Sequence, residues 1–145
     1  MLTPPYFLLL AIVSSIFLHF YFPIAKIIPP KYNYIGIPIM IASYALIGHV
    51  DYLFKQKQTT IDSFGKASIL ITDGVFKISR NPIYLGMSLL LFGLCVLLRS
   101  ASTLIPLALF IIIINVIIIP KEEKSLKDTF GDSYILYLKK VRRWV

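Results

Sequence analysis

The stretch SILITDGVFKISRNPIYLG, residues 68–86, joins a polar loop to an uncharged, apolar run. Asn81 is a suitable N-cap for a helix, because its side-chain oxygen can accept a free amide proton of the first turn. Pro82 suits the first helical position, where the missing N–H leaves no hydrogen bond unmade. We therefore expect a membrane-spanning helix to begin here, where water, lipid head groups and hydrocarbon meet.

The apolar pattern of this helix recurs elsewhere in the chain. Hydrophobic residues make up 57% of the 145 residues, too many for an ordinary soluble domain of this length. The first apolar run has neither the basic flank nor the cleavage motif of a signal peptide, so we expect it to remain as a span. The sequence predicts a single-domain, all-α, polytopic membrane protein with four transmembrane helices, at about residues 5–22, 35–54, 82–98 and 101–119.

Basic residues beside the spans predict the orientation, because lysine and arginine near a span stay in the cytoplasm. Twelve of the 15 fall between the second and third spans or after the fourth, whereas Lys26, Lys31 and Arg99 fall on the other side. We expect a multi-pass integral membrane protein with both termini and the long middle loop in the cytoplasm. The net charge of +8 follows from this placement, so we expect the lipid bilayer as a partner and no nucleic acid.

Few residues have the chemistry of a metal site or a disulfide. Cys95 is the only cysteine, and His19 and His49 belong to separate spans, so we expect no disulfide within the chain and no metal. Asn115 is the lone strongly polar residue deep in the fourth span. Because polar groups in hydrocarbon seek partners, we interpret Asn115 as a contact between helices, with a place beside a reaction centre as the alternative.

The sequence after Pro120 is amphipathic. Gly131 is expected to divide this C-terminal helical tail into two short helices, which suit the surface of a membrane. Apolar and aromatic residues recur in the tail at steps of three and four, which places them on one helical face: Leu126, Phe130, Tyr134, Tyr137, Leu138 and Val141.

Two motifs, in order along the chain, carry a family resemblance. The first is Gly74-Val75-Phe76 followed by Arg80-Asn81-Pro82-Ile83-Tyr84. The second is Glu122-Glu123 followed by Leu126, Phe130-Gly131, Tyr134 and Tyr137, then basic residues and Trp144. Together they resemble the isoprenylcysteine carboxyl methyltransferase and phospholipid N-methyltransferase superfamily, small integral-membrane enzymes that use S-adenosylmethionine. The resemblance covers about residues 59–144.

The resemblance implies a role for residues in both motifs. It implies S-adenosylmethionine as the cofactor, bound by Ser68, Ile69, Leu70, Ile71, Phe76, Asn81, Pro82, Ile83, Tyr84, Glu122 and Glu123. It implies catalytic roles for Arg80, Asn81, Glu122 and Glu123, and contacts with the substrate for Tyr134, Tyr137, Arg142 and Arg143. The chain departs from the eukaryotic carboxyl methyltransferases at Asn81, where they have histidine. Asn81 cannot titrate as a base.

Each of these assignments has a simpler alternative. Glu122 and Glu123 follow Pro120, and acids in a first helical turn are stabilised by the helix dipole. Spacing alone does not separate this explanation from a site, whereas the resemblance favours carboxylates that bind the ammonium group of the cofactor. Arg80 can instead be an anchoring charge. The tyrosines and arginines of the tail can likewise be membrane-interface anchors.

The chemistry of methyl transfer suits this chain. Transfer from a sulfonium depends on alignment and exclusion of water rather than on a nucleophilic residue. We predict transfer to a lipophilic small-molecule or prenylated substrate at the cytosolic face, most simply a carboxylate of an isoprenylcysteine-like substrate, with a phospholipid amine as the alternative. A small four-span transporter and a non-enzymatic scaffold are the rival classes. The acidic residue of the predicted spans, Asp51, lies at the cytosolic end of the second, so no acid in mid-membrane can couple ions, which argues against the transporter.

Overall fold

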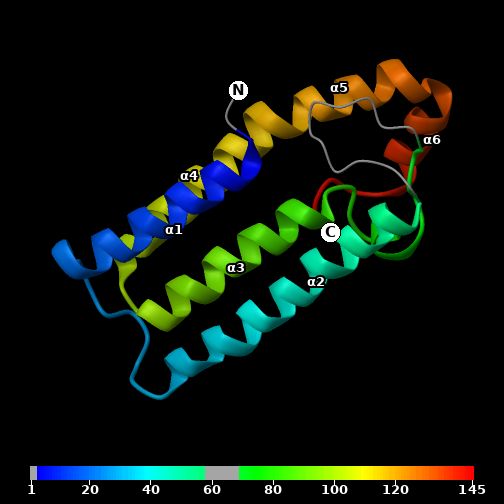
Figure 1. Ribbon diagram of the computed structural model, residues 1–145. Coiled ribbons are helices and arrows are strands. Elements are labelled where there is room, and N and C mark those ends of the chain that lie inside the picture. The colour runs from blue at the N-terminus through cyan, green and yellow to red at the C-terminus, as the bar shows by residue number, and fades with distance from the viewer. Residues whose placement is uncertain (1–2, 58–68) are drawn as a thin grey trace.

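A computed structural model describes residues 3–57 and 69–145, and in these ranges the chain is helical (Figure 1). No β-strand occurs among the described residues, where an isolated bridge joins Lys26 to Ser100. The predicted all-α class is therefore confirmed. The elements are α1 (Pro4–Tyr21), η1 (Tyr32–Ile35), α2 (Gly36–Gln56), η2 (Gly74–Lys77), α3 (Pro82–Leu98), η3 (Ala101–Thr103), α4 (Leu104–Ile113), the π-helical turn η4 (Ile114–Ile118), α5 (Ile119–Phe130) and α6 (Asp132–Lys140).

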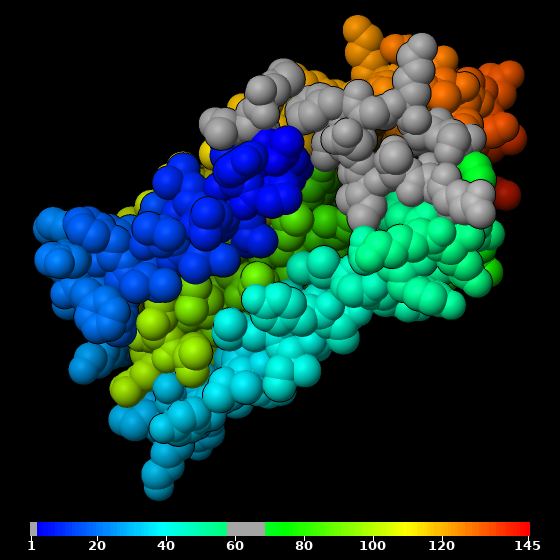
Figure 2. All heavy atoms as spheres, in the orientation of Figure 1, coloured from blue at the N-terminus to red at the C-terminus, as the bar shows by residue number. Residues whose placement is uncertain are grey.

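Helix α3 lies at the centre of the bundle. It contacts α1, α2 and α4, whereas α2 packs mainly along α3. Figure 2 shows α3 between α1 and α2. The apolar core accordingly contains residues from α3, such as Met87 and Leu91, together with Ala11 of α1 and Phe110 of α4. The outward faces of α1 and α2 carry many exposed large hydrophobic residues, as expected for helices that face lipid.

Small residues allow α2 and α3 to pack closely. A Cβ atom on Gly36 would overlap the carbonyl oxygen of Gly93, and a Cβ atom on Gly93 would lie 2.7 Å from Cγ of Met40. Further along the same pair of helices, Oγ of Ser43 donates a 2.7 Å hydrogen bond to the carbonyl oxygen of Gly86. Such contacts matter in lipid, where no hydrophobic force drives helices together.

The helix of the fourth predicted span is longer than the sequence predicted, because it continues into the charged residues after Pro120. It continues without a break through α4, η4 and α5, so that Ala101–Phe130 is one apolar-to-polar helix of 30 residues. At 1.5 Å per residue it extends roughly 45 Å, which exceeds a hydrocarbon core of about 30 Å. Its charged last part, α5, therefore projects beyond the bundle (Figure 1). Gly131, with φ of +52°, then separates α5 from α6 as predicted.

Among the described residues, three helical segments are long and apolar enough to cross a membrane: Pro4–Tyr21, Tyr32–Gln56 and Ala101–Phe130. Helix α3 has the predicted bounds and is apolar, but at 17 residues it is shorter. Figure 1 shows the start of α1, the end of α2, the start of α3 and α5 at one end of the bundle. At the opposite end, Nε of Arg99 donates a 2.8 Å hydrogen bond to the carbonyl oxygen of Ile28.

The start of α3 is partly as predicted. Asn81 is the N-cap residue and Pro82 is in the first turn, but the side chain of Asn81 makes no capping hydrogen bond. That detail of the prediction is wrong, and the side chain of Asn81 is held by the C-terminal segment, with Nδ2 donating to the carbonyl oxygen of Arg143 at 3.1 Å. The C-terminal segment thus competes for the capping side chain.

Two glycines of α2 give a matched test of close packing. Gly36→Ala is expected to destabilise the protein by about 1–3 kcal/mol, because the added methyl group meets the backbone of α3. Gly48→Ala is expected to leave stability unchanged or raise it by up to about 1 kcal/mol, because a Cβ at Gly48 has no atom within 4 Å. Thermal unfolding in detergent compares the two variants. Equal midpoints would contradict the packing described.

Candidate functional site

Two predicted motifs meet the C-terminal segment, residues 141–145, at one end of the bundle. The backbone N–H of Arg80 donates to the carbonyl oxygen of Arg142, at 3.0 Å. The carbonyl oxygen of Arg143 accepts from Oγ of Ser79 at 3.3 Å and from Nδ2 of Asn81 at 3.1 Å. The last residues of the chain therefore run beside the Arg-Asn-Pro motif that begins α3.

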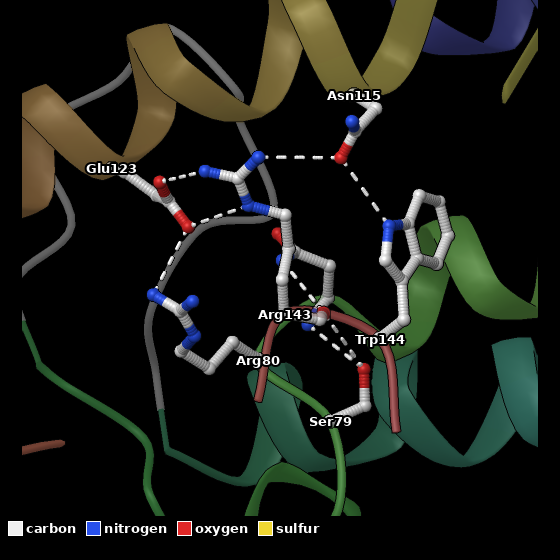
Figure 3. Close-up of polar contacts among 7 residues, drawn as sticks. Ser79, Arg80, Asn115, Glu123, Arg143 and Trp144 are labelled. Carbon is white, nitrogen blue, oxygen red and sulfur yellow. Dashed lines mark hydrogen bonds and ion pairs between the residues drawn. The ribbon is translucent and has the colours of Figure 1, made fainter. Parts of the chain in front are cut away.

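Glu123 of α5 is at the centre of an ion-pair network (Figure 3). Its Oε1 lies 3.0 Å from Nη1 of Arg80, and its Oε2 lies 2.7 Å from Nη2 of Arg143. Arg143 also donates from Nε to Oε1 at 3.2 Å, so that it holds the carboxylate with two hydrogen bonds. The side chains of Glu123 and Arg80 are only 19% and 13% exposed. Glu123 therefore binds two guanidinium groups in a partly desolvated place.

Glu122 contacts a different part of the protein. Its Oε1 accepts a 2.6 Å hydrogen bond from Oη of Tyr84, in the first turn of α3. Consecutive helical residues point about 100° apart, so the neighbouring carboxylates of Glu122 and Glu123 have separate partners. This hydrogen bond directly joins the first motif to the second, and the ring of Tyr84 that makes it is only 5% exposed.

Asn115, in the apolar part of the long helix, hydrogen-bonds to the C-terminal segment. Its Oδ1 accepts from Nη1 of Arg143 at 3.2 Å and from Nε1 of Trp144 at 3.3 Å. The indole of Trp144 also packs against the apolar core of the bundle. Asn115 therefore has a polar partner, as predicted, but that partner is the C-terminal segment rather than another membrane-spanning helix.

The two tyrosines of α6 are inside the protein. Tyr134 and Tyr137 are 2% and 7% exposed, and Oη of Tyr137 donates a 2.7 Å hydrogen bond to the carbonyl oxygen of Phe76. Burial raises the pKa of Tyr134 to about 12, the negative charge of Glu123 adds to this, and Arg80 opposes it. Burial likewise raises the pKa of Tyr137. Neither ring is at the surface, where an interfacial anchor would lie.

Of the predicted cofactor-binding residues in and before η2, some are buried and some are exposed. Ile71 and Phe76 belong to a second apolar cluster with the α6 tyrosines, and the ring of Phe54 packs edge-on against Phe76 with centroids 5.8 Å apart. Ile69 is exposed. Ser68 lies outside the described residues.

Some of the predicted site residues lie together at this end of the bundle, and others do not. The structure brings together Arg80, Asn81, Tyr84, Glu122, Glu123 and Arg143. The side chain of Arg142 is exposed, and Pro82 is buried at the start of α3. In the part of the chain that is described, no three histidine, cysteine, aspartate or glutamate side chains gather as metal ligands would.

Two members of the site were missed from the sequence. Ser79 is 1% exposed and binds both the C-terminal segment and the backbone N–H of Asn81. Its position immediately before the Arg-Asn-Pro motif was the only available signal. Trp144 was noted as part of the motif, but its contact with Asn115 joins residues 29 positions apart and leaves no local pattern.

Removal of the central carboxylate tests the ion-pair network. Glu123→Gln leaves two guanidinium groups side by side without their shared counter-charge, so we expect a loss of about 2 kcal/mol of stability. This is below the loss for a fully buried pair, because Arg143 is 32% exposed. The matched control is Asp128→Asn, at an exposed position of the same helix. Equal unfolding midpoints in the two variants would show that the network contributes nothing.

The burial of Tyr134 predicts its ionisation. The difference in phenolate absorbance between wild type and Tyr134→Phe is expected to have its midpoint near pH 12 in the folded protein. In denaturant the midpoint should return to about 10. Because the folded pKa is raised, Tyr134 stabilises the fold below pH 10, and this contribution is lost as the pH rises from 10 to 12. A folded midpoint near 10 would contradict the burial.

Known proteins resemble the chain across most of its length. The model of the family described as "Phospholipid methyltransferase" matches residues 32–133, which contain α2 to α5 and the acidic pair. A protein of Haemophilus influenzae described as "Uncharacterized protein" is 37% identical over 62 residues, which cover 43% of this chain and 98% of that protein. No solved structure matches the chain.

Proposed function

The chain belongs to the phospholipid methyltransferase family, a family of membrane methyltransferases, and from this we propose that it transfers a methyl group from S-adenosylmethionine to a phospholipid amine. The observation that carries the proposal is the meeting of the two motifs. Tyr84 from the first motif binds Glu122 from the second, and Arg80 binds Glu123, at the end of the bundle where α5 leaves it. Residues far apart in sequence thereby form one polar site.

The chemistry of these side chains suits the cofactor. A carboxylate is a good partner for the ammonium group of S-adenosylmethionine, and guanidinium groups suit carboxylates and phosphates. Both are present within the site, next to an apolar cluster that contains Phe76. When bound, the cofactor supplies a methyl group on a positively charged sulfur, which is already a good leaving group.

Glu122 and Glu123 have different roles in this proposal. Both oxygens of Glu123 are held by Arg80 and Arg143, which neutralise its charge. Glu122 is oriented by the hydroxyl of Tyr84 and is the carboxylate that receives the ammonium group. Glu123 then serves to hold the two guanidinium groups in place.

Arg80 is suited to bind an anionic group of the acceptor. Its Nε is buried and has no hydrogen-bond partner among the described residues, although Nη1 is paired with Glu123. A buried donor of this kind is costly unless a partner is supplied. A phosphate oxygen of a lipid head group would supply it and would place the head-group amine beside the site.

The proposed topology has four spans, with α3 as the third. A helix of 17 residues lies at the lower limit of length for a span. Helix α3 also runs alongside α2, which is long enough to span (Figure 1). The basic residues of the loop after α2 and of α5 and α6 support a cytoplasmic location for the site and both termini. A lipid acceptor can enter from the bilayer, and the cofactor from water.

The family favours the amine over the carboxylate that the sequence first suggested. An isoprenylcysteine carboxylate could also bind Arg80, so the two candidate acceptors are compared directly in a methyl-transfer assay. Purified protein is incubated with methyl-labelled S-adenosylmethionine and vesicles that contain either phosphatidylethanolamine or a farnesylcysteine in phosphatidylcholine. We expect label in N-methylated phosphatidylethanolamine. Label in the farnesylcysteine alone would overturn the acceptor and retain the methyl transfer.

The role of Glu122 is tested in the same assay. Glu122→Gln removes a charge-assisted hydrogen bond to the cofactor and is expected to lower the rate at limiting cofactor about ten- to hundredfold. Asp128→Asn, which changes an exposed carboxylate of α5, should retain the wild-type rate. Equal rates in all three proteins would remove Glu122 from the site. No label in any lipid with folded wild type would refute the methyl transfer itself.

A further inference from the structure

The helix that carries the acidic pair contains the π-helical turn η4, which ends two residues before Pro120. Proline has no N–H, and its ring clashes with the carbonyl group four residues earlier, here Val116. A wider π turn accommodates both effects, and such turns occur frequently at functional sites. Asn115 is the polar residue of this turn.

Asn115 uses one oxygen to hold two side chains of the C-terminal segment. Oδ1 accepts from Nη1 of Arg143 at 3.2 Å and from Nε1 of Trp144 at 3.3 Å. Figure 3 shows Arg143 between Asn115 and Glu123, with the indole of Trp144 on the other side of Asn115. The same guanidinium group that binds Glu123 is therefore fixed from the membrane-spanning part of the helix.

The opposite side of the C-terminal segment is held through its backbone. Ser79 and Asn81 both donate to the carbonyl oxygen of Arg143, and the N–H of Arg80 donates to that of Arg142. Residues 141–145 thus lie between the start of α3 and the helix that contains η4 and α5. Through Arg143 they also contact Glu123.

We propose that Asn115 is a positioning residue, which holds the C-terminal segment in place as the acceptor-side wall of the site. The hydrogen bonds to Arg143 and Trp144 fix this wall between the polar residues at Glu123 and the apolar core that Trp144 contacts. An amphiphilic acceptor must pass the same boundary between polar head group and hydrocarbon. The positioning itself rests on the contacts alone, whereas its effect on the acceptor rests on the proposed function.

Trp144 is the only tryptophan of the chain, so its fluorescence reports the wall directly. The experiment measures quenching by acrylamide in detergent-solubilised wild type, Asn115→Leu and Asn115→Asp. Leucine has a similar size but accepts no hydrogen bond, and we expect it to raise the released fraction of the segment about tenfold or more. Aspartate keeps both acceptor contacts and should leave Trp144 as shielded as in wild type.

A kinetic measurement tests the consequence for the acceptor. With phosphatidylethanolamine vesicles, Asn115→Leu is expected to raise KM for the lipid about tenfold, while the affinity for S-adenosylhomocysteine is unchanged, because the hydrogen bond between Tyr84 and Glu122 does not involve Asn115. Rescue of KM by Asn115→Asp would support the positioning role. A general loss of structure would instead weaken both ligands together.

Each result decides one part of the proposal. Equal shielding of Trp144 in wild type and Asn115→Leu overturns the positioning. Increased quenching with an unchanged KM for the lipid would show that the C-terminal segment does not contact the acceptor. If Asn115→Leu does not fold, Asn115→Ser, whose shorter side chain cannot reach both donors, takes its place under the same criteria. If wild type transfers no methyl group, the proposed function fails, and the quenching still decides the role of Asn115.

Discussion

The polar end of this bundle depends on the balance of charge around Glu123. A carboxylate and two guanidinium groups lie together beside an apolar core, where each would be costly alone. Their mutual contacts join three parts of the chain: the start of α3, the first turns of α5, and the C-terminal segment. Without Glu123, the two arginines would repel each other, and the last residues would lose their strongest contact with the bundle.

This balance explains how a bundle of apolar helices can hold a polar site at its end. The close packing of α2 on α3, with Ser43 hydrogen-bonded to Gly86, holds the part of α3 that carries Tyr84. The long helix from Ala101 to Phe130 carries the acidic pair out of the apolar region. Glu122 and Glu123 then bind different partners, Glu122 the hydroxyl of Tyr84 and Glu123 the two arginines.

Local features of the fold were predictable from the sequence. Pro82 at the start of α3 and Gly131 between α5 and α6 act through the backbone of their own residues, and both were placed correctly. The family resemblance carried by the two motifs also grouped Arg80, Tyr84 and the acidic pair in one predicted site. The pairing of Glu123 with Arg143 was not predicted, because it depends on how the chain end returns to the bundle. The π turn before Pro120 was also missed. A proline alone predicts a break or a kink, and does not predict a helix that continues through a π turn.

In the proposed function, the two motifs form one cofactor site through Tyr84 and Glu122. A double-mutant cycle measures it directly, with calorimetric titration of S-adenosylhomocysteine into wild type, Tyr84→Phe, Glu122→Gln and the double variant. If the hydroxyl acts by orienting the carboxylate, the double variant loses no more affinity than Glu122→Gln alone. Losses that simply add would show that the two residues act independently, and affinity that is unchanged in all variants would contradict a site at this place.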